Sequence, residues 1–368
     1  ISHNIYENNF ISIFFIKIMT AVRLVTANDE QKLKKFYKNA YGENHILNNS
    51  SHSDWQFLKN PFNKLSSKSI IIAENNDEIV AHMGIIPVPV KIYDNIVTGA
   101  WHASYFTLEK FRGIGIGTKM VQLSNSLFYC IGGMGNSDAS NNIHIKNGGK
   151  NFQDINRYVK ILEKKTVENF VQKQIITKKG NATKSKGFCR INMLDVNYDK
   201  FWNIVKNRFP ITINRTKEYL TWRYFQHPLI DYHFMVLTKD QNILGYSILR
   251  FEDNNKDLKA GRIVDFVSFE QYETELLQNI QNYFENKVDF IDFFCSNSIY
   301  KHTLEKEGFF NNKIMNYSIP TVFNPINKNR NSINLHLKIN SFPTTDTKYY
   351  NNENLFFIKA DADQDRAF

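Results

Sequence analysis

The sequence predicts an α/β chain, α+β in detail, built from two similar units that each carry a mixed, mainly antiparallel sheet flanked by helices. Short β-branched strands alternate along the chain with helices that have one apolar face. Hydrophobic residues make up 42% of the 368 residues, which is enough for ordinary packed cores. An eight-residue phrase also occurs twice, as WQFLKNPF at 55–62 and as WRYFQHPL at 222–229.

The first series of elements precedes residue 138. Asn28 is expected to cap a helix, because Gln31 stands at capping-box spacing. The first copy of the phrase then predicts a short helix that ends at Pro61. The remaining expected elements are strand, turn and strand over 69–92, a strand over 98–108, a glycine-rich turn over 109–119, a helix through Met120 and Leu127, and a strand over 129–137.

The second series repeats this order after residue 190. It comprises a helix over 198–209, the second phrase, strand, turn and strand over 233–252, a strand over 261–269, a helix over 273–286 and a buried strand over 288–297. The spacing is 167 residues between Trp55 and Trp222 and 162 residues between Gly99 and Gly261. Because small loop deletions would produce this slow drift, we interpret the two series as a repeated domain rather than as chance similarity.

Composition narrows the class of protein. The net charge of +10 favours an anionic partner, although general solubility explains it equally well. The three cysteines show no CxxC spacing, so we expect a reducing cytoplasm, no disulfide framework and no bound metal. The apolar run from Phe10 to Met19 is too short to span a bilayer, so no transmembrane segment is predicted.

The stretch FRGIGIG at 111–117 joins a predicted strand to a predicted helix. Glycines allow backbone N–H groups to approach a ligand closely and to adopt positive φ. The N-terminus of the following helix, near Thr118, carries about half a positive charge. Neither a dinucleotide-binding GxGxxG fingerprint nor a P-loop lysine pattern is present. The stretch therefore predicts an anion cradle suited to a diphosphate.

This stretch resembles the acetyl-CoA-binding motif of the GNAT superfamily of N-acetyltransferases. The motif Arg-x-x-Gly-x-Gly falls on Arg112, Gly115 and Gly117, and the resemblance extends over residues 20–165. It implies that acetyl-CoA is the co-substrate and that a backbone N–H on the preceding strand stabilises the oxyanion. The residues implied to bind the cofactor are Tyr105, Phe106, Thr107, Arg112, Gly113, Ile114, Gly115, Ile116, Gly117 and Thr118.

The second series resembles the same fold without this motif. Glu270, Glu273 and Glu275 stand where the glycines would be, and carboxylates there repel phosphates. LEKEGFF at 304–310 still resembles a superfamily signature, which indicates a degenerate domain. The expected divisions are an extension at 1–18, which a non-native origin would explain, a cofactor-binding domain at 19–165, a basic linker at 166–190, the degenerate domain at 191–341 and a solvated tail at 342–368.

The resemblance also implies the catalytic groups. The base often stands about ten residues before the motif arginine, which points to His102, whose ordinary pKa of about 6.5 suits the task. A partly buried structural histidine is the alternative interpretation. Glu109 is a second candidate base and His82 a weaker one. The superfamily's tyrosine acid has no counterpart near Gly148, which leaves His144, Asp138 or water as the acid.

The resulting functional hypothesis is an N-acetyltransferase that acts on a small-molecule amine, with an amino sugar as one example. No nucleic-acid partner is expected. One alternative is an aminoacyl-tRNA-dependent transferase of the Fem type, in which the linker lysines 178, 179, 184 and 186 would contact RNA. Another alternative is a coenzyme A-binding module without catalysis. The sequence leaves open the acceptor, the acyl length and the oligomeric state.

Overall fold

The computed structural model describes residues 20–152, 154–177, 185–253, 258–314, 317, 319–321 and 332–366. The expected extension at 1–18 and three of the four linker lysines, at 178, 179 and 184, lie outside the described residues. Two compact units are present. The first contains the described residues up to Pro89, together with Val97–Asn151 and His336–Thr344. The second contains Val90–Ile96, the described residues between Phe152 and Leu335, and those from Thr345 onwards.

The first unit is built on one mixed sheet. β1 to β3 pair antiparallel, whereas β4 and β5 pair parallel. The order across the sheet is β1 (Thr20–Leu24), β2 (Ile70–Asn75), β3 (Glu78–Ile92), β4 (Asn95–Thr107), β5 (Cys130–Met134), β15 (Leu335–Ile339) and β6 (Lys150–Phe152).

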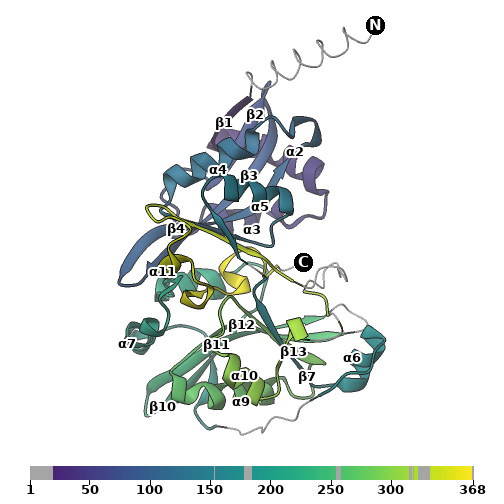
Figure 1. Ribbon diagram of the computed structural model, residues 1–368, viewed down its shortest axis with the longest axis vertical. Helices are drawn as coiled ribbons and strands as arrows, with labels where there is room; N and C mark the ends of the chain where they lie inside the picture. Colours follow the sequence, from purple (N-terminus) through teal and green to yellow (C-terminus); the bar gives the residue numbers. More distant parts are fainter. Residues whose placement is uncertain are drawn as a thin grey trace. The chain divides into compact units, whose positions relative to one another are not determined.

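Among the described residues, four helices belong to this unit: α2 (Glu30–Tyr41), α3 (Ser50–Phe57), α4 (Ile116–Leu127) and α5 (Asp138–Lys146) (Figure 1). A 3-10 turn, Ala27–Asp29, leads into α2. The N-cap of this turn is Thr26 rather than the expected Asn28, because the Asp29 carboxylate accepts from the Thr26 N–H. α4 contacts β1, β2 and α5, and its apolar face closes a core with the inner residues of β2 and β3.

The second unit has its own mixed sheet, in which only β12 and β13 pair parallel. The order is β14 (Phe310–Asn311), β7 (Asn156–Ile161), β13 (Phe290–Cys295), β12 (Lys259–Ser268), β11 (Asn242–Asp253), β10 (His233–Lys239) and β8 (Phe188–Ile191). β9 (Ile211–Ile213) pairs with β16 (Leu355–Phe356) and with the last residues of β3. The helices are α6 (Lys164–Val171), α7 (Val196–Val205), α8 (Lys217–Leu220), α9 (Glu273–Phe284), α10 (Lys301–Lys306) and α11 (Thr347–Tyr350).

The order of elements in the second unit repeats that of the first. In each unit a hairpin leads to a strand, a 3-10 turn, a long helix, a parallel strand, a shorter helix and a last short strand. The expected fold class of two mainly antiparallel sheets flanked by helices is therefore confirmed. Within the described residues, no helix is both long and apolar enough to cross a bilayer.

One strand position in each sheet is filled from a distant part of the chain. In the first unit β15 lies between β5 and β6, although about 180 residues separate it from β6. In the second unit β7, which directly follows β6 in the chain, lies between β13 and β14. The compact units therefore divide the chain differently from the expected boundaries at 165 and 191, because sheet pairing and not chain order assigns these strands.

The stretch 355–365 is largely buried and is not the solvated tail that the sequence indicated, whereas residues 342–354 are mostly exposed or partly exposed. Asp361 and Asp365 are only 2% and 6% exposed. Asp361 forms an ion pair with the buried Arg215, at 3.1 Å. Asp365 pairs with Arg250 at 3.0 Å and accepts a hydrogen bond from the Tyr232 hydroxyl at 2.7 Å. These charges are tolerated inside the unit because each carboxylate has a buried cation beside it.

We expect Asp365→Asn to lower the free energy of unfolding by about 3 kcal/mol, because it leaves Arg250 with less counter-charge in a buried site. Asp363→Asn is the matched control, since the ion pair of Asp363, at 3.3 Å, is with Arg366, which is one-third exposed, and an Asn oxygen can still accept from the Gln364 side chain; it should cost less than about 0.5 kcal/mol. Urea unfolding of both variants measures the difference. Equal stability of the two variants would contradict a stabilising role for the buried Asp365–Arg250 pair.

The same pair predicts a pH dependence. Burial opposes ionisation of Asp365, but the attraction of Arg250 outweighs it and lowers the pKa to about 2. Because the pKa in the unfolded chain is about 3.9, the stabilisation is present above that value and is lost as the pH falls towards 2. Unfolding curves between pH 5 and 2.5 should show a smaller acid destabilisation in Asp365→Asn than in the unaltered chain.

Candidate functional site

The candidate site begins where β4 and β5 part. The two strands pair at Gly99 with Cys130, Ala100 with Ile131 and Trp101 with Gly132. β4 continues to Thr107, and no further pairing with β5 is recorded in the described part of the chain. One edge of β4 from residue 102 onwards is therefore open to an extended ligand, which could add to the strand through main-chain hydrogen bonds.

A turned peptide lies on this open stretch of β4. Ser104 has a φ of 48°, which is rare for a residue with a side chain. The Ser104 carbonyl accepts hydrogen bonds from the Tyr41 hydroxyl and from Nδ1 of His82, the latter at 2.9 Å. Because a trans peptide directs its C=O and N–H in opposite directions, the N–H of Tyr105 points away from α2 and β3. This N–H is a fixed donor of the kind that stabilises an oxyanion.

His82 is the residue that holds this peptide. It is fully buried, and burial lowers its pKa to about 4, so the ring is neutral at pH 7. The Tyr37 hydroxyl lies 3.2 Å from Nε2, which leaves Nδ1 as the ring donor to Ser104. The sequence offered His82 as a weak candidate for the base, whereas in the structure both ring nitrogens are engaged in positioning β4.

The glycine-rich stretch forms a cradle of free N–H groups. Gly113 and Gly115 have φ values of 79° and 90°, which residues with a Cβ rarely adopt. Among the described residues, no acceptor is found for the backbone N–H groups of residues 113–118, which end in the first turn of α4. Nε of Arg112 donates to the Thr107 carbonyl at 2.9 Å and ties the cradle to the end of β4.

The charge around the cradle favours an anion. No acidic residue stands in the first turn of α4, and no side chain caps that end, where Gly115 is the N-cap. The corresponding helix α9 differs, because Glu273 stands in its first turn and its carboxylate is held by Arg208 at 2.5 Å and by Thr303 at 2.6 Å. The helix dipole is thus free to bind an external anion at α4, whereas a buried carboxylate stands in the first turn of α9 and would repel one.

Tyr105 contributes a group that the sequence did not single out, namely its hydroxyl. This hydroxyl is buried and has no hydrogen-bond partner within the described residues. It lies against Gly117, where an added Cβ would come within 2.1 Å of the Tyr105 oxygen. Burial raises the pKa of the phenol far above its ordinary value, so it stays protonated and can donate to a ligand. Gly117 is therefore needed for the close packing of β4 against α4.

The expected cofactor residues gather around this cradle. Phe106 lies under the Arg112 guanidinium, 5.3 Å from the ring centre, and Ile116 is buried in the core. Ile114 packs against that core. Thr118 lies on the first turn of α4. The geometry thus brings together the stretch 105–107 and the stretch 112–118, as the sequence indicated.

The candidate catalytic residues are placed differently. His102 is 4% exposed, its Nε2 lies 2.8 Å from the Ser124 hydroxyl, and burial lowers its pKa well below the ordinary value. It is therefore a weak base closed off from solvent. Glu109 is exposed beside the cradle and stays a prediction. Of the candidate acids, Asp138 is exposed, whereas His144 is buried beside His102 and His336. These three histidines are the one grouping of potential metal ligands found among the described residues.

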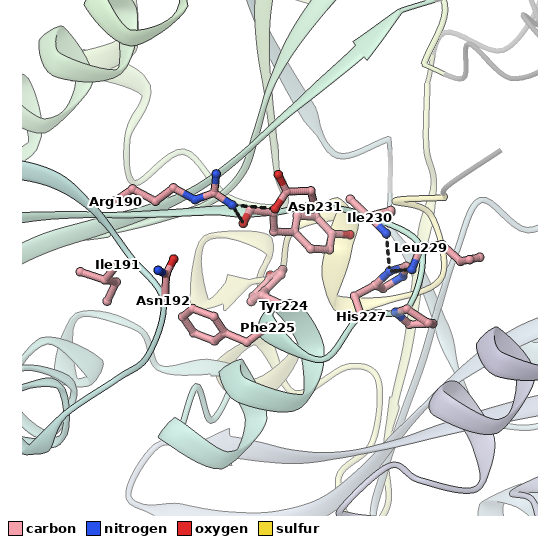
Figure 2. A pocket seen from close by; sticks show the side chains of 11 residues that line it. Arg190, Ile191, Asn192, Tyr224, Phe225, His227, Leu229, Ile230 and Asp231 are labelled. Atoms are coloured by element: carbon pink, nitrogen blue, oxygen red, sulfur yellow. Dashed lines mark hydrogen bonds and ion pairs between the residues drawn. The ribbon is translucent and has the colours of Figure 1, made fainter.

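The second unit contains a separate pocket of about 540 Å³, which is in the size range of small-molecule sites. Five residues of the second phrase line it, namely Tyr224, Phe225, His227, Pro228 and Leu229 (Figure 2). Arg190 and Asp231 form an ion pair at its rim, at 2.6 Å. The His227 ring accepts hydrogen bonds from the N–H groups of Leu229 and Ile230 and so shapes the floor.

A family model matches part of the first unit. Residues 21–125 match the family model of the acetyltransferase (GNAT) domain. No curated protein sequence matches the chain.

Similar solved structures cover most of the chain. A conserved protein of Enterococcus faecalis described as a probable N-acyltransferase has 10% identity and a TM-score of 0.57, over 87% of this chain and 72% of that one. A GCN5-related N-acetyltransferase from Anabaena variabilis has 11% identity and a TM-score of 0.58, with the same coverages. The Saccharomyces cerevisiae N-myristoyltransferase with bound myristoyl-CoA has 12% identity and a TM-score of 0.50, over 92% of this chain and 86% of that one. The likeness shows that both units share the fold of these proteins.

We expect Gly115→Ala to weaken the binding of coenzyme A by about tenfold or more. A Cβ at a φ of 90° costs about 1–2 kcal/mol, which the loop relieves by giving up the cradle geometry. Gly42→Ala is the matched control, because Gly42 has a φ of 88°, open space around it and no place in the cradle. Calorimetric titration with coenzyme A measures both variants. Equal affinity of the two variants would rule out the cradle as the diphosphate site.

Proposed function

Because residues 21–125 belong to the acetyltransferase (GNAT) domain family, we propose that the chain is an N-acyltransferase that moves an acyl group, in the first place acetyl, from coenzyme A to a small-molecule amine. The observation that carries this proposal is the run of unpartnered N–H groups at residues 113–118, beside the open edge of β4. In a coenzyme A thioester, the diphosphate matches the N–H groups of 113–118, and the extended pantetheine arm matches the open edge of β4.

The reaction would use these groups in order. The diphosphate accepts from the N–H groups of 113–118, and the pantetheine arm lies along β4 beyond Trp101. The thioester carbonyl then meets the N–H of Tyr105. The amine nitrogen attacks the carbonyl carbon, the C–N bond forms, and the oxyanion accepts from that N–H. Collapse of the intermediate breaks the C–S bond, and the thiolate leaves with a proton from solvent.

In this scheme, solvent-exposed groups remove the proton from the amine. His102 is closed off from solvent, so we assign it no proton transfer. The Glu109 carboxylate or water takes the proton, since both are accessible beside the cradle. Without a buried base, the rate should follow the fraction of acceptor amine present as free base and rise with pH up to the amine's own pKa.

For the second unit we propose a GNAT-like domain that has lost coenzyme binding. The support is the occupation of the α9 end by Glu273 and its partners. The 540 Å³ pocket of this unit is in the size range of small-molecule sites. Cys130 and Cys295 are buried free thiols, which agrees with the cytoplasm as the proposed compartment.

The direct test is thiol release from acyl-CoA in the presence of amines, amino-sugar nucleotides included. Acetyl-CoA and myristoyl-CoA form the two ends of the donor series, because fold relatives include proteins named for both acyl groups. Amine-dependent release supports the proposal. Coenzyme A binding without release from any donor supports a non-catalytic module, and transfer only from aminoacyl-tRNA supports the Fem-type alternative.

The turned peptide between Ser104 and Tyr105 leads to a further prediction. Tyr41→Phe removes one of the two hydrogen bonds that orient the Ser104 carbonyl, so kcat should fall about fivefold, in line with the loss of about 1 kcal/mol. The affinity for coenzyme A should stay unchanged, because the cradle is intact. Tyr93→Phe is the control, since its hydroxyl also donates to a carbonyl, that of Lys348 in the second unit. A loss of coenzyme affinity in place of kcat would show that Tyr41 acts through folding alone.

A further inference from the structure

We propose that His102, His144 and His336 form a binding site for a divalent transition-metal ion, with Zn²⁺ as the best fit. The three residues belong to β4, α5 and β15 of the first unit. His144 and His336 are 192 residues apart in the chain. This inference is independent of acyl transfer, because it rests on a different set of atoms.

The three side chains form one buried cluster inside the unit, in which the His144 and His336 rings are stacked. All are buried, with exposures of 4%, 4% and 0%, and one ligand atom of each lies within 4.8 Å of the others. The ring centres of His144 and His336 are 3.7 Å apart, and that of His102 is 5.0 Å from His144. Three imidazole ligands are a usual donor set for zinc, with water in the fourth position.

Each histidine leaves one ring nitrogen without a partner. Nδ1 of His102, Nε2 of His144 and Nε2 of His336 are buried and have no hydrogen-bond partner within the described residues. Buried polar atoms are rarely left unsatisfied, and three of them in one cluster call for an explanation. A metal ion satisfies all three through their lone pairs.

The opposite ring nitrogens of two of these residues have polar partners. Nε2 of His102 lies 2.8 Å from the Ser124 hydroxyl, which can accept from it, and Nδ1 of His336 lies 2.9 Å from the side-chain amide nitrogen of Asn136. Such outer contacts fix the tautomer and the ring orientation of metal-binding histidines. Metal on Nε2 of His336 requires the Asn136 amide to present its oxygen to Nδ1–H, which a half-turn of that amide provides.

The sheet provides room for the cluster at Gly133. This residue follows Gly132, the last partner of β4, and so lies on the same face of the sheet as His102. A Cβ at Gly133 would come within 2.3 Å of the His336 ring. The glycine therefore lets the ring from β15 lie across β5 towards β4.

Coordination requires a modest closure of the cluster. Zinc–nitrogen bonds of about 2.0–2.1 Å place tetrahedral ligand atoms about 3.3 Å apart, so the widest pair must approach by roughly 1.5 Å. No carboxylate belongs to the cluster within the described residues, so water or hydroxide would take the fourth position. The ion would join β15 to β4 and α5, three elements that the chain brings together from distant positions.

The test uses the full chain without a polyhistidine tag. After chelator treatment and dialysis it is titrated with Co²⁺, whose tetrahedral complexes absorb visible light strongly, and then with Zn²⁺ as competitor. We expect one ion per chain, a tetrahedral Co²⁺ spectrum that Zn²⁺ abolishes, and a melting temperature that rises with Zn²⁺. A chain that binds no Co²⁺, or gives only the weak octahedral spectrum, overturns the proposal whatever the variants do.

Variants locate the site. His144→Gln and His336→Gln should each weaken Zn²⁺ binding by at least about 100-fold, and Ser124→Ala by about tenfold, as outer contacts do. Gly133→Ala keeps all three ligands and should still weaken binding, because its Cβ displaces the His336 ring. His302→Gln, on the exposed face of α10, is the control and should bind as the unaltered chain does. Circular dichroism confirms folding, and folded ligand variants that keep the Co²⁺ spectrum refute the assignment.

Discussion

The parting of β4 from β5 is the constraint on which the rest of the first unit depends. Their pairing stops at Trp101 and Gly132. Beyond that point, the edge of β4 is open, the peptide after Ser104 is turned and held by Tyr41 and His82, and the strand leads into the glycine cradle. A sheet that continued to pair here would consume the very N–H groups that a ligand could use.

The two units show how one arrangement of elements can gain or lose a ligand site. Both have a strand, a 3-10 turn and a long helix in the same order. At α4 the helix end is bare and flanked by glycines, whereas at α9 Glu273 fills it with the help of Arg208. The backbone dipole is the same in both, so the difference in side-chain charge at the helix end supports the proposal that the first unit, and not the second, binds a diphosphate.

The strand β15, which joins the first sheet from a distant part of the chain, connects the fold to the histidine cluster. β15 completes the first sheet between β5 and β6, and it carries His336. A strand that comes from a distant part of the chain closes a long loop, which has an entropic cost. Burying polar rings there without partners would weaken the unit, and a bound ion would remove that cost while fixing the strand.

The sequence by itself determined the repeated order of elements, the cradle at 111–117 and the residues implied to surround it. These features are local, because glycine conformation, helix ends and apolar periodicity depend on neighbours in the chain. Only the tertiary structure decided that His102 is buried against Ser124, that Asp365 is anchored by Arg250, and that His336 meets His144. Those contacts join residues far apart in the sequence, and burial and partnership at such distances are set by sheet pairing, which no local pattern encodes.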